Sequence, residues 1–402
     1  MSKSSGILLF AGMLAMSGQP ALAEPVSLSD AMARGQEVSP RIAKAKAELK
    51  AAEGRAMQAG VRPNPTISAE VENFSGTGPY RTFGQTETTV AVSQPFELGG
   101  KRRARKAVAA AERDFAQIAL RRAEADLSYD IIVAHAELRA AEDRAALSQS
   151  VLARAVELAR IAETLVDVGR DPPLTKLRAD ALLAEAKAES LKATAQLLSA
   201  RQKLALFIGS DDPELSAVPQ DIPSPPALPS DAQSLDERLA AAERDAASAR
   251  VRLAQADGVP DITASGGVRN FRESKDTAFI VGVSIPLPVF NRNRGNISAA
   301  RAEGDAAEAQ LAQTRLDTRF SRRDAELMLT AANERVSALS GVGLYQASEA
   351  ARVAEIGYQQ GKFTLIELID AQEALTSANL KLIEAQLDRA RALAALGRAN
   401  AQ

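Results

Sequence analysis

Residues 94–102, QPFELGGKR, lie between two segments of different periodicity. Before it, residues 89–95 place Val90 and Val92 in alternation with polar or small side chains, which is typical of a strand with one apolar face. After it, residues 101–168 contain neither Pro nor Gly and are rich in Ala, Leu, Arg and Glu, which favours helix throughout. At about 1.5 Å per residue, this helix would be roughly 100 Å long. A strand therefore leads directly into a very long helix.

The same strand-to-helix arrangement occurs a second time, at PLPVFNRNRG, residues 286–295. Pro95-Phe96 corresponds to Pro286-Leu287 at an offset of 191 residues, and Gly169-Arg170 corresponds to Gly361-Lys362 at an offset of 192. Offsets this constant indicate two homologous halves. Each half has the order helix, two strands, very long helix, turn and helix.

Turn and loop residues divide each half, because consecutive X-Pro steps and Gly-rich stretches interrupt helices and strands. The predicted units are a signal peptide 1–23, a first repeat 24–208, a Pro-rich linker 209–230 and a second repeat 231–402. The first repeat is expected to contain a helix from Leu28 to Gly60, a β-hairpin 64–96, a long helix 101–168 and a helix 174–207. The second repeat is expected to contain a helix, a β-hairpin 260–288, a long helix 296–360 and a helix 364–398. A strict heptad within 174–207 predicts close packing on another helix: Leu174, Leu177, Ala181, Ala184, Ala188, Leu191, Ala195 and Leu198.

The N-terminal residues predict an export signal. Lys3 precedes an apolar run, residues 6–16, that is too short to span a bilayer, and Ala21-Leu22-Ala23 has the pattern of a cleavage site. We expect cleavage after Ala23 and, because no Cys follows, no lipid anchor there. Beyond this segment no apolar run approaches about 20 residues, so no transmembrane helix is expected in the mature chain.

The composition disfavours most catalytic and binding chemistries. The 402 residues include no Cys, which excludes disulfides, thiolate metal sites and Cys nucleophiles. His135 is the single His, and its place between two Ala in the long helix favours packing over metal binding. With 49 basic and 51 acidic residues, the net charge of -2 argues against a nucleic-acid binder. We expect no enzyme, no cofactor and no resident metal.

The four predicted strands need partners from outside the chain. Their apolar face suits lipid, but four strands cannot close a barrel, and open sheet edges are not tolerated inside a bilayer. Oligomerisation is therefore expected. Three chains would supply twelve strands, which lies in the size range of transmembrane barrels, and two or four chains would also give even numbers. The alternative is a periplasmic coiled-coil scaffold with no pore.

Six segments carry a family resemblance. They are Pro63-Asn64-Pro65, Glu72-Asn73-Phe74, residues 94–102, residues 286–295, residues 358–362 (YQQGK) and residues 365–372 (LIELIDAQ). Together they resemble outer-membrane efflux proteins of the TolC family, and most of all the branch that serves cobalt-zinc-cadmium resistance systems. The resemblance covers essentially the whole mature chain and includes the duplication. Many members carry an N-terminal lipidated Cys, which this chain lacks.

The resemblance implies a mainly α fold with β, assembled as a homotrimer. Each chain would contribute four strands to a twelve-strand barrel in outer-membrane lipid, continuous with a coiled-coil tunnel of twelve helices in the periplasm. The implied partners are a periplasmic adaptor (membrane fusion) protein and, through it, an inner-membrane RND-type pump. The chain would be the passive exit duct for divalent heavy-metal cations. The alternatives are a duct for organic solutes or type I protein secretion, and the scaffold without a pore.

The resemblance also places a candidate constriction at the periplasmic end. Glu367 and Asp370 share a helix face and would form acidic rings in a trimer, attracting cations. The first half has Arg178 at the position of Asp370, so Arg178 is a candidate latch that pairs with either acid. Tyr358 is a further candidate for the constriction. The alternative for the two acids is an ordinary solvated helix face.

Two more groups of residues are candidates. Gly169 and Arg170 in the first half, and Gly361 and Lys362 in the second, occupy helix-to-helix turns, where a positive φ is useful and an adaptor would dock. On the strands, three acids have the parity of the polar face and are expected to line the barrel lumen: Glu70, Glu72 and Glu87.

Overall fold

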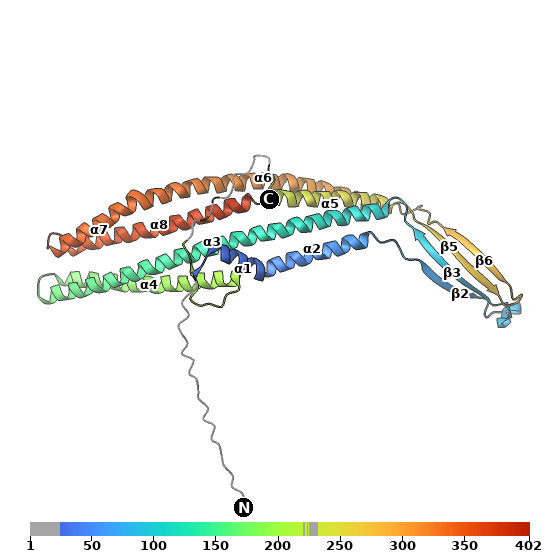
Figure 1. The fold of residues 1–402 in the computed structure, drawn as a ribbon, viewed down its shortest axis with the longest axis horizontal. Coiled ribbons are helices and arrows are strands. Elements are labelled where there is room, and N and C mark those ends of the chain that lie inside the picture. The colour runs from blue at the N-terminus through green and yellow to red at the C-terminus, as the bar shows by residue number, and fades with distance from the viewer. Residues whose placement is uncertain (1–24, 220–221, 223, 225–231) are drawn as a thin grey trace, which may run out of the picture.

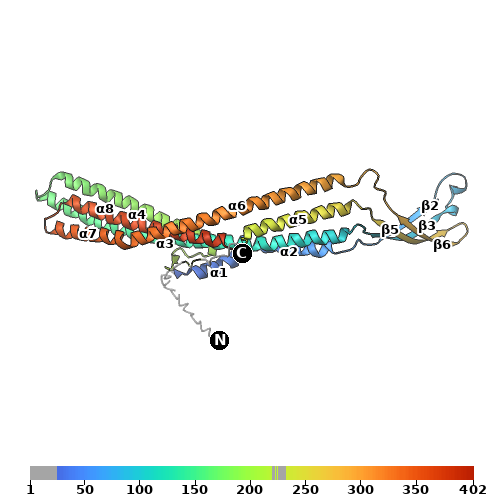
Figure 2. The ribbon, with the colours of Figure 1, turned by 90° about the horizontal axis from the view of Figure 1, so that it is seen from above.

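The structure, a computed structural model, describes residues 25–219, 222, 224 and 232–402. The predicted signal peptide 1–23 lies outside the described residues, as does most of the second half of the linker. The molecule is elongated in both views, with long helices running side by side, a sheet at one end and two helical turns at the other (Figures 1 and 2). The expected mainly α fold with a sheet of four strands is confirmed.

The sheet is built from two hairpins, one from each half. Its strands are β2 (Thr66–Glu72), β3 (Glu87–Phe96), β5 (Ile262–Phe271) and β6 (Thr277–Ser284). They are antiparallel and lie in the order β2-β3-β5-β6. The two hairpins therefore join through β3 and β5, and β2 and β6 remain as edges within the described part of the chain.

The register separates an apolar face from a polar face. Ile67 lies opposite Val92, and Val90 opposite Val268, so these apolar side chains share one face. That face is uncovered: Val281 is 85% exposed. The alternate residues, including Glu70 opposite Thr89, form the polar face. No helix within the described ranges is both long and apolar enough to cross a bilayer.

The first half forms four helices. These are α1 (Leu28–Val38), α2 (Pro40–Ala59), α3 (Lys101–Asp167) and α4 (Pro173–Ile208). The single helix expected from Leu28 to Gly60 was wrong. Ser39 has an extended conformation, with φ -65° and ψ 120°, and Pro40 begins a new helix. The cause is the proline ring, which disfavours helical backbone in the residue before it.

The second half forms α5 (Leu235–Asp257), α6 (Arg294–Ala338), α7 (Leu344–Gln359) and α8 (Leu365–Ala399). The expected continuous helix 296–360 was also wrong, because a π-helical turn, η3 (Leu339–Gly343), separates α6 from α7. Gly341 in this turn has φ -84° and ψ -107°, which is not helical. The equivalent part of α3 has no Gly and continues without interruption.

The predicted heptad of α4 is not the face that packs inside the chain. Its Leu177 and Leu191 are exposed, whereas Ala179, Ala186 and Ala193 are buried. The helix has two stripes of apolar residues, and the smaller Ala side chains allow the closer approach to α3. The Leu stripe therefore has no partner in the described chain.

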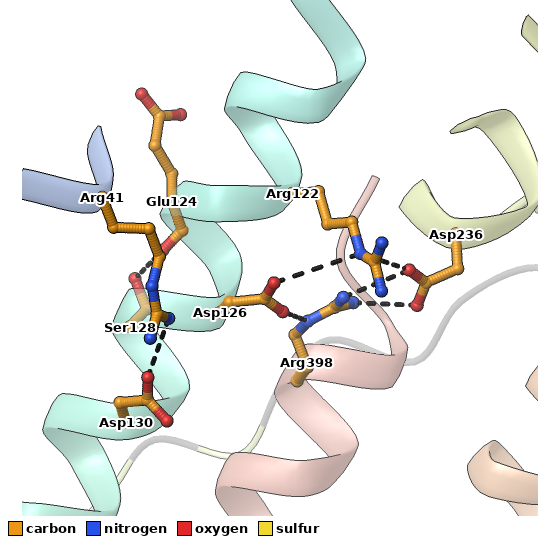
Figure 3. Close-up of polar contacts among 8 residues, drawn as sticks. All are labelled: Arg41, Arg122, Glu124, Asp126, Ser128, Asp130, Asp236 and Arg398. Carbon is orange, nitrogen blue, oxygen red and sulfur yellow. Dashed lines mark hydrogen bonds and ion pairs between the residues drawn. The ribbon is translucent and has the colours of Figure 1, made fainter. Parts of the chain in front are cut away.

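A charged network joins the two halves (Figure 3). Arg398 of α8 pairs with Asp126 of α3 and, at 3.2 Å, with Asp236 of α5. Arg122 of α3 pairs with Asp236 at 2.8 Å. Because Arg398 is only 15% exposed in its side chain, these contacts are stronger than solvated surface pairs. They hold helices of both halves in one wall.

Part of the predicted linker packs into the core. Strand β4 (Ser216–Ala217) pairs in parallel with β1 (Pro25–Val26), and Leu215 is buried in the same cluster as Leu138 of α3. His135 is buried there, and its Nε2 lies 3.1 Å from the carbonyl oxygen of Val26. Burial lowers the pKa of His135, although the bond to Val26 opposes the shift. The position is one of core packing.

Candidate functional site

The first helix-to-helix turn closes α3 onto α4 at the end far from the sheet (Figure 1). Gly169 has φ +72°, a left-handed conformation that favours glycine. The amides of Arg170 and Asp171 donate to the carbonyl oxygen of Leu165, at 2.8 and 3.2 Å. These bonds satisfy an otherwise free carbonyl at the end of α3.

The second turn, between α7 and α8, repeats this geometry. Gly361 has φ +69°, and the amides of Lys362 and Phe363 donate to the carbonyl oxygen of Gly357, at 2.8 and 3.2 Å. The ring of Phe363 packs against Gly357, where a Cβ would overlap the ring. Tight turns of one shape thus end both hairpins.

Small side chains pack the two hairpins together behind the turns. The buried cluster contains Ala159 and Ala162 of α3, Ala179 of α4, Ala354 of α7, and Leu365 and Leu368 of α8. Tyr358 packs against this cluster, and its buried hydroxyl has no hydrogen-bond partner within the described residues. Burial raises the pKa of Tyr358, the Asp171 carboxylate raises it further, and Arg170 lowers it. The phenol of the second hairpin therefore lies beside the turn of the first.

Glu367 has a structural contact that the sequence analysis did not assign. It is the third residue of α8 in a capping box: the amide of Thr364 donates to Glu367 Oε2 at 2.7 Å, and the amide of Glu367 donates to Thr364 Oγ1 at 3.3 Å. The bond from the Thr364 amide, and a second bond that the Thr364 hydroxyl donates to the same oxygen at 2.9 Å, lower the pKa of Glu367. The signal was visible as Thr364 three residues before Glu367. Asp370 is exposed one turn further along.

Arg178 is exposed on α4 and forms no ion pair with Glu367 or Asp370 in the described chain. The nearby pair on this hairpin is Lys176 with Glu163, 2.6 Å apart, which ties α4 to α3. The latch predicted for Arg178 is therefore not present within one chain.

The polar face of the sheet brings the predicted acids together with a residue that the sequence analysis missed. Glu72 lies directly opposite Glu87, and Arg269 of β5 contacts both, at 2.9 and 3.0 Å. Arg269 Nε also donates to Thr89 Oγ1 at 2.9 Å. Like charges directly opposite each other destabilise a strand pair, so Arg269 offsets that repulsion. Glu70 lies on the same face, in register with Thr89.

The charged side chains of the candidate site lie at the two ends of the molecule and not in one cluster (Figure 1). Across residues 25–219, 222, 224 and 232–402, no cluster of three or more His, Asp or Glu side chains is placed to hold a metal ion. Charged side chains are instead placed at the two ends of a long wall: the acid-arginine group on the sheet, and Glu367 and Asp370 near the helical turns.

Comparison with known proteins places this arrangement in a family. The model of the family "Outer membrane efflux protein" matches residues 34–210 and 228–401, once in each half. The cobalt-zinc-cadmium resistance protein CzcC of Cupriavidus metallidurans is 30% identical over 370 residues, covering 90% of this chain and 86% of the relative. The nickel-cobalt-cadmium resistance protein NccC of Alcaligenes xylosoxydans xylosoxydans is 31% identical over 392 residues, covering 96% and 89%.

Solved structures share the fold over nearly the whole chain. The outer-membrane channel OprN has a TM-score of 0.79 at 25% identity, covering 92% of this chain and 89% of the other. The Campylobacter jejuni CmeC outer membrane channel has a TM-score of 0.81 at 14% identity, covering 98% and 93%. With both halves matched and the fold shared from end to end, the chain belongs to the outer membrane efflux protein family.

Proposed function

We propose that this chain is the outer-membrane exit duct of a tripartite RND-type system that exports divalent heavy-metal cations. The observation that carries the proposal is the uncovered apolar face of the sheet, whose outer strands β2 and β6 are each paired on one side only within the described residues. The relatives of this chain are cobalt, zinc, cadmium and nickel resistance proteins. A duct performs no reaction, so we expect neither enzymatic activity nor a cofactor.

Closure of the sheet requires further copies of the chain. An open edge costs several kcal/mol for each unsatisfied backbone group in lipid, so β2 and β6 must pair with strands of neighbouring copies. Three copies give a twelve-strand barrel with the apolar face toward lipid and the polar face toward the lumen. Glu70, Glu72 and Glu87, with Arg269, would then line the lumen.

The helical wall supports the same closure. On one edge, α4 exposes its Leu stripe, including Leu177 and Leu191. On the opposite edge, α7 exposes Tyr345 and Ile356. Two different apolar edges on one chain make a head-to-tail interface, which forms a closed ring when the rotation between copies is right. A homotrimer would place twelve helices around a periplasmic tunnel.

The end with the two turns is the proposed contact with the periplasmic adaptor, which would couple the duct to the inner-membrane pump. Gly169 and Arg170, with Gly361 and Lys362, lie at this end and are exposed. Behind them, Asp370 and the free face of Glu367 would form the narrow acidic entrance, with Tyr358 beside it and Arg178 available to an adjacent copy.

Two measurements test the proposal. Deletion of the gene should reduce tolerance to zinc, cobalt, cadmium or nickel, and the wild-type chain should restore it. The purified protein should come from the outer-membrane fraction with the mass of three chains. Unchanged tolerance to all four metals would contradict the metal cargo while leaving the duct intact. Release by osmotic shock as a monomer would instead support the scaffold without a pore.

A further inference from the structure

The segment between β6 and α6, residues 285–294, exposes large apolar side chains directly before a pair of arginines. Leu287 is 79% exposed and Phe290 is 100% exposed. Arg292 and Arg294 follow and are exposed as well. The side chains of Ile285 and Leu287 continue the alternation of the apolar face of β6, so this segment prolongs the proposed lipid-facing surface.

This segment is held in place by hydrogen bonds. Asn293 has φ +57°, its amide donates to Asn291 Oδ1 at 3.0 Å, and its Nδ2 donates to the carbonyl oxygen of Ala254 at the end of α5, at 2.7 Å. Arg292 Nε donates to the carbonyl oxygen of Pro288 at 3.2 Å. Phe290 is therefore presented to solvent by an anchored loop.

The equivalent junction of the first half repeats the pattern. Phe96 is exposed at the end of β3, and the first turns of α3 carry Arg103 and Lys106, which share a helix face. Neither forms an ion pair in the described chain. Two neighbouring cations do form ion pairs: Lys101 pairs with Asp261 at 2.8 Å, and Arg105 pairs with Glu97.

The two junctions lie at one level, where the sheet meets the helices (Figure 1). If the helices occupy the periplasm, as the proposed function requires, this level is the periplasmic surface of the outer membrane. Exposed cations that have no acidic partner in the described chain, beside exposed apolar and aromatic groups, suit a phospholipid surface, because the apolar groups enter the acyl region while the cations meet phosphates. A lipid headgroup without net charge would attract these cations less than an anionic headgroup does.

We propose that these residues form a belt that binds anionic phospholipid headgroups of the periplasmic leaflet. The belt consists of Leu287, Phe290, Arg292, Arg294, Arg103 and Lys106. Its cations recognise the negative headgroup, and Phe290 and Leu287 fix the depth of the duct in the membrane. The inference rests on the proposed outer-membrane orientation and adds the class of lipid that is recognised.

The first test measures headgroup preference. The delipidated oligomer is titrated with phosphatidylglycerol or phosphatidylethanolamine, and bound lipid is counted by native mass spectrometry. Wild type should retain phosphatidylglycerol in preference. The combined variant Arg103→Gln, Lys106→Gln, Arg292→Gln and Arg294→Gln should lower that preference by about tenfold or more. The matched control changes four exposed cations away from the belt: Arg121→Gln, Lys187→Gln, Arg315→Gln and Arg319→Gln. It should behave as wild type.

The second test measures membrane depth at the belt. Because the chain has no Trp, Phe290→Trp gives a single reporter. In vesicles that contain brominated phosphatidylglycerol its emission should be quenched, whereas the emission of Phe320→Trp, at an exposed position on α6, should not be.

The outcomes separate the belt from the duct. Equal retention of both lipids, or a control variant that loses as much lipid as the belt variant, overturns the headgroup preference even though the protein inserts. Insertion with an unquenched Trp at position 290 overturns the placement of the belt. Failure of the folded wild type to insert into any vesicle overturns the belt together with the proposed duct.

Discussion

Replacement of Arg269 by Gln should make the duct more selective for cations. Arg269 contacts Glu72 Oε2 at 2.9 Å and Glu87 Oε2 at 3.0 Å, and Glu70 lies on the same face. Three carboxylates and one guanidinium give this group a formal charge of about -2 in each chain when all are ionised. Arg269→Gln makes it about -3, and the change is repeated in each of the three proposed copies.

The magnitude follows from Coulomb's law. A unit charge about 10 Å from the axis of a water-filled lumen changes the energy of a monovalent ion by about 0.4 kcal/mol, so three charges contribute about 1.2 kcal/mol. At roughly 0.1 M salt, screening over this distance reduces the effect to about 0.4 kcal/mol. Cations gain this energy and anions lose it. The ratio of cation to anion permeability should therefore rise by about fourfold.

The assay is the zero-current potential of single channels in planar bilayers under a KCl gradient. Arg269→Lys keeps the charge and should retain the wild-type ratio. Arg272→Gln removes the same charge beyond the end of β5 and should have a smaller effect, because the lost charge lies outside the acidic group. Channels of Arg269→Gln with an unchanged ratio, or with a shift toward anions, would refute the placement of this group in the lumen.

Three further predictions concern the helices. Gly341→Ala should convert the π-helical turn into regular helix, since Ala favours helix by about 1 kcal/mol over Gly, and hydrogen exchange at residues 339–343 should slow by about fivefold. Thr364→Ala should fray the start of α8 by removing its cap, which costs about 1 kcal/mol of stability. Glu367→Gln keeps the capping box and removes only the charge. Comparing the metal tolerance of the two variants separates the capping role of Glu367 from the role of its charge. Glu137 should stabilise the fold at neutral pH and lose that contribution in acid. Burial raises the pKa of Glu137, but the hydrogen bonds from Lys203 and Arg391 lower it by more, so the folded pKa lies below the unfolded value. The stabilisation is complete above about pH 5 and disappears as the pH falls through the folded pKa. The difference in thermal midpoint between wild type and Glu137→Gln should therefore vanish at a pH below the folded pKa.

Each of these predictions has a contradicting result. Unchanged exchange in Gly341→Ala would show that the turn is imposed by packing rather than by the glycine. Full metal tolerance in Glu367→Gln would show that the charge of Glu367 has no role in the constriction, and Asp370 would remain as the acidic candidate. A thermal difference at Glu137 that persists in strong acid would mean that its contacts with α4 and α8 contribute through packing rather than charge.

Much of the fold was visible in local patterns. Alternation revealed the four strands of the larger sheet, and the absence of Pro and Gly from 101–168 predicted α3 to within a residue. The two breaks that were missed also had local signals, since Pro40 begins α2 and two glycines fall at the end of α6. Those signals were outweighed by long stretches of helix-forming residues around them.

The candidate site was less predictable. Gly169 and Gly361 were identified as turn residues because a left-handed conformation favours glycine wherever it occurs. Arg269 was missed because its two acidic partners lie some 180 residues away on the other hairpin. Its strand parity was readable, but the register of β3 against β5 was not.

The element order, the duplication and the apolar face of each strand could be predicted from the sequence, because these follow from periodicity and from backbone preferences of neighbouring residues. Tertiary packing selects which stripe of α4 lies on α3, which cation neutralises Glu72 and Glu87, and which cations of the sheet-helix junction remain without an acidic partner. These depend on side chains brought together from distant parts of the chain, where small differences in size and register select one pairing among several of similar local pattern.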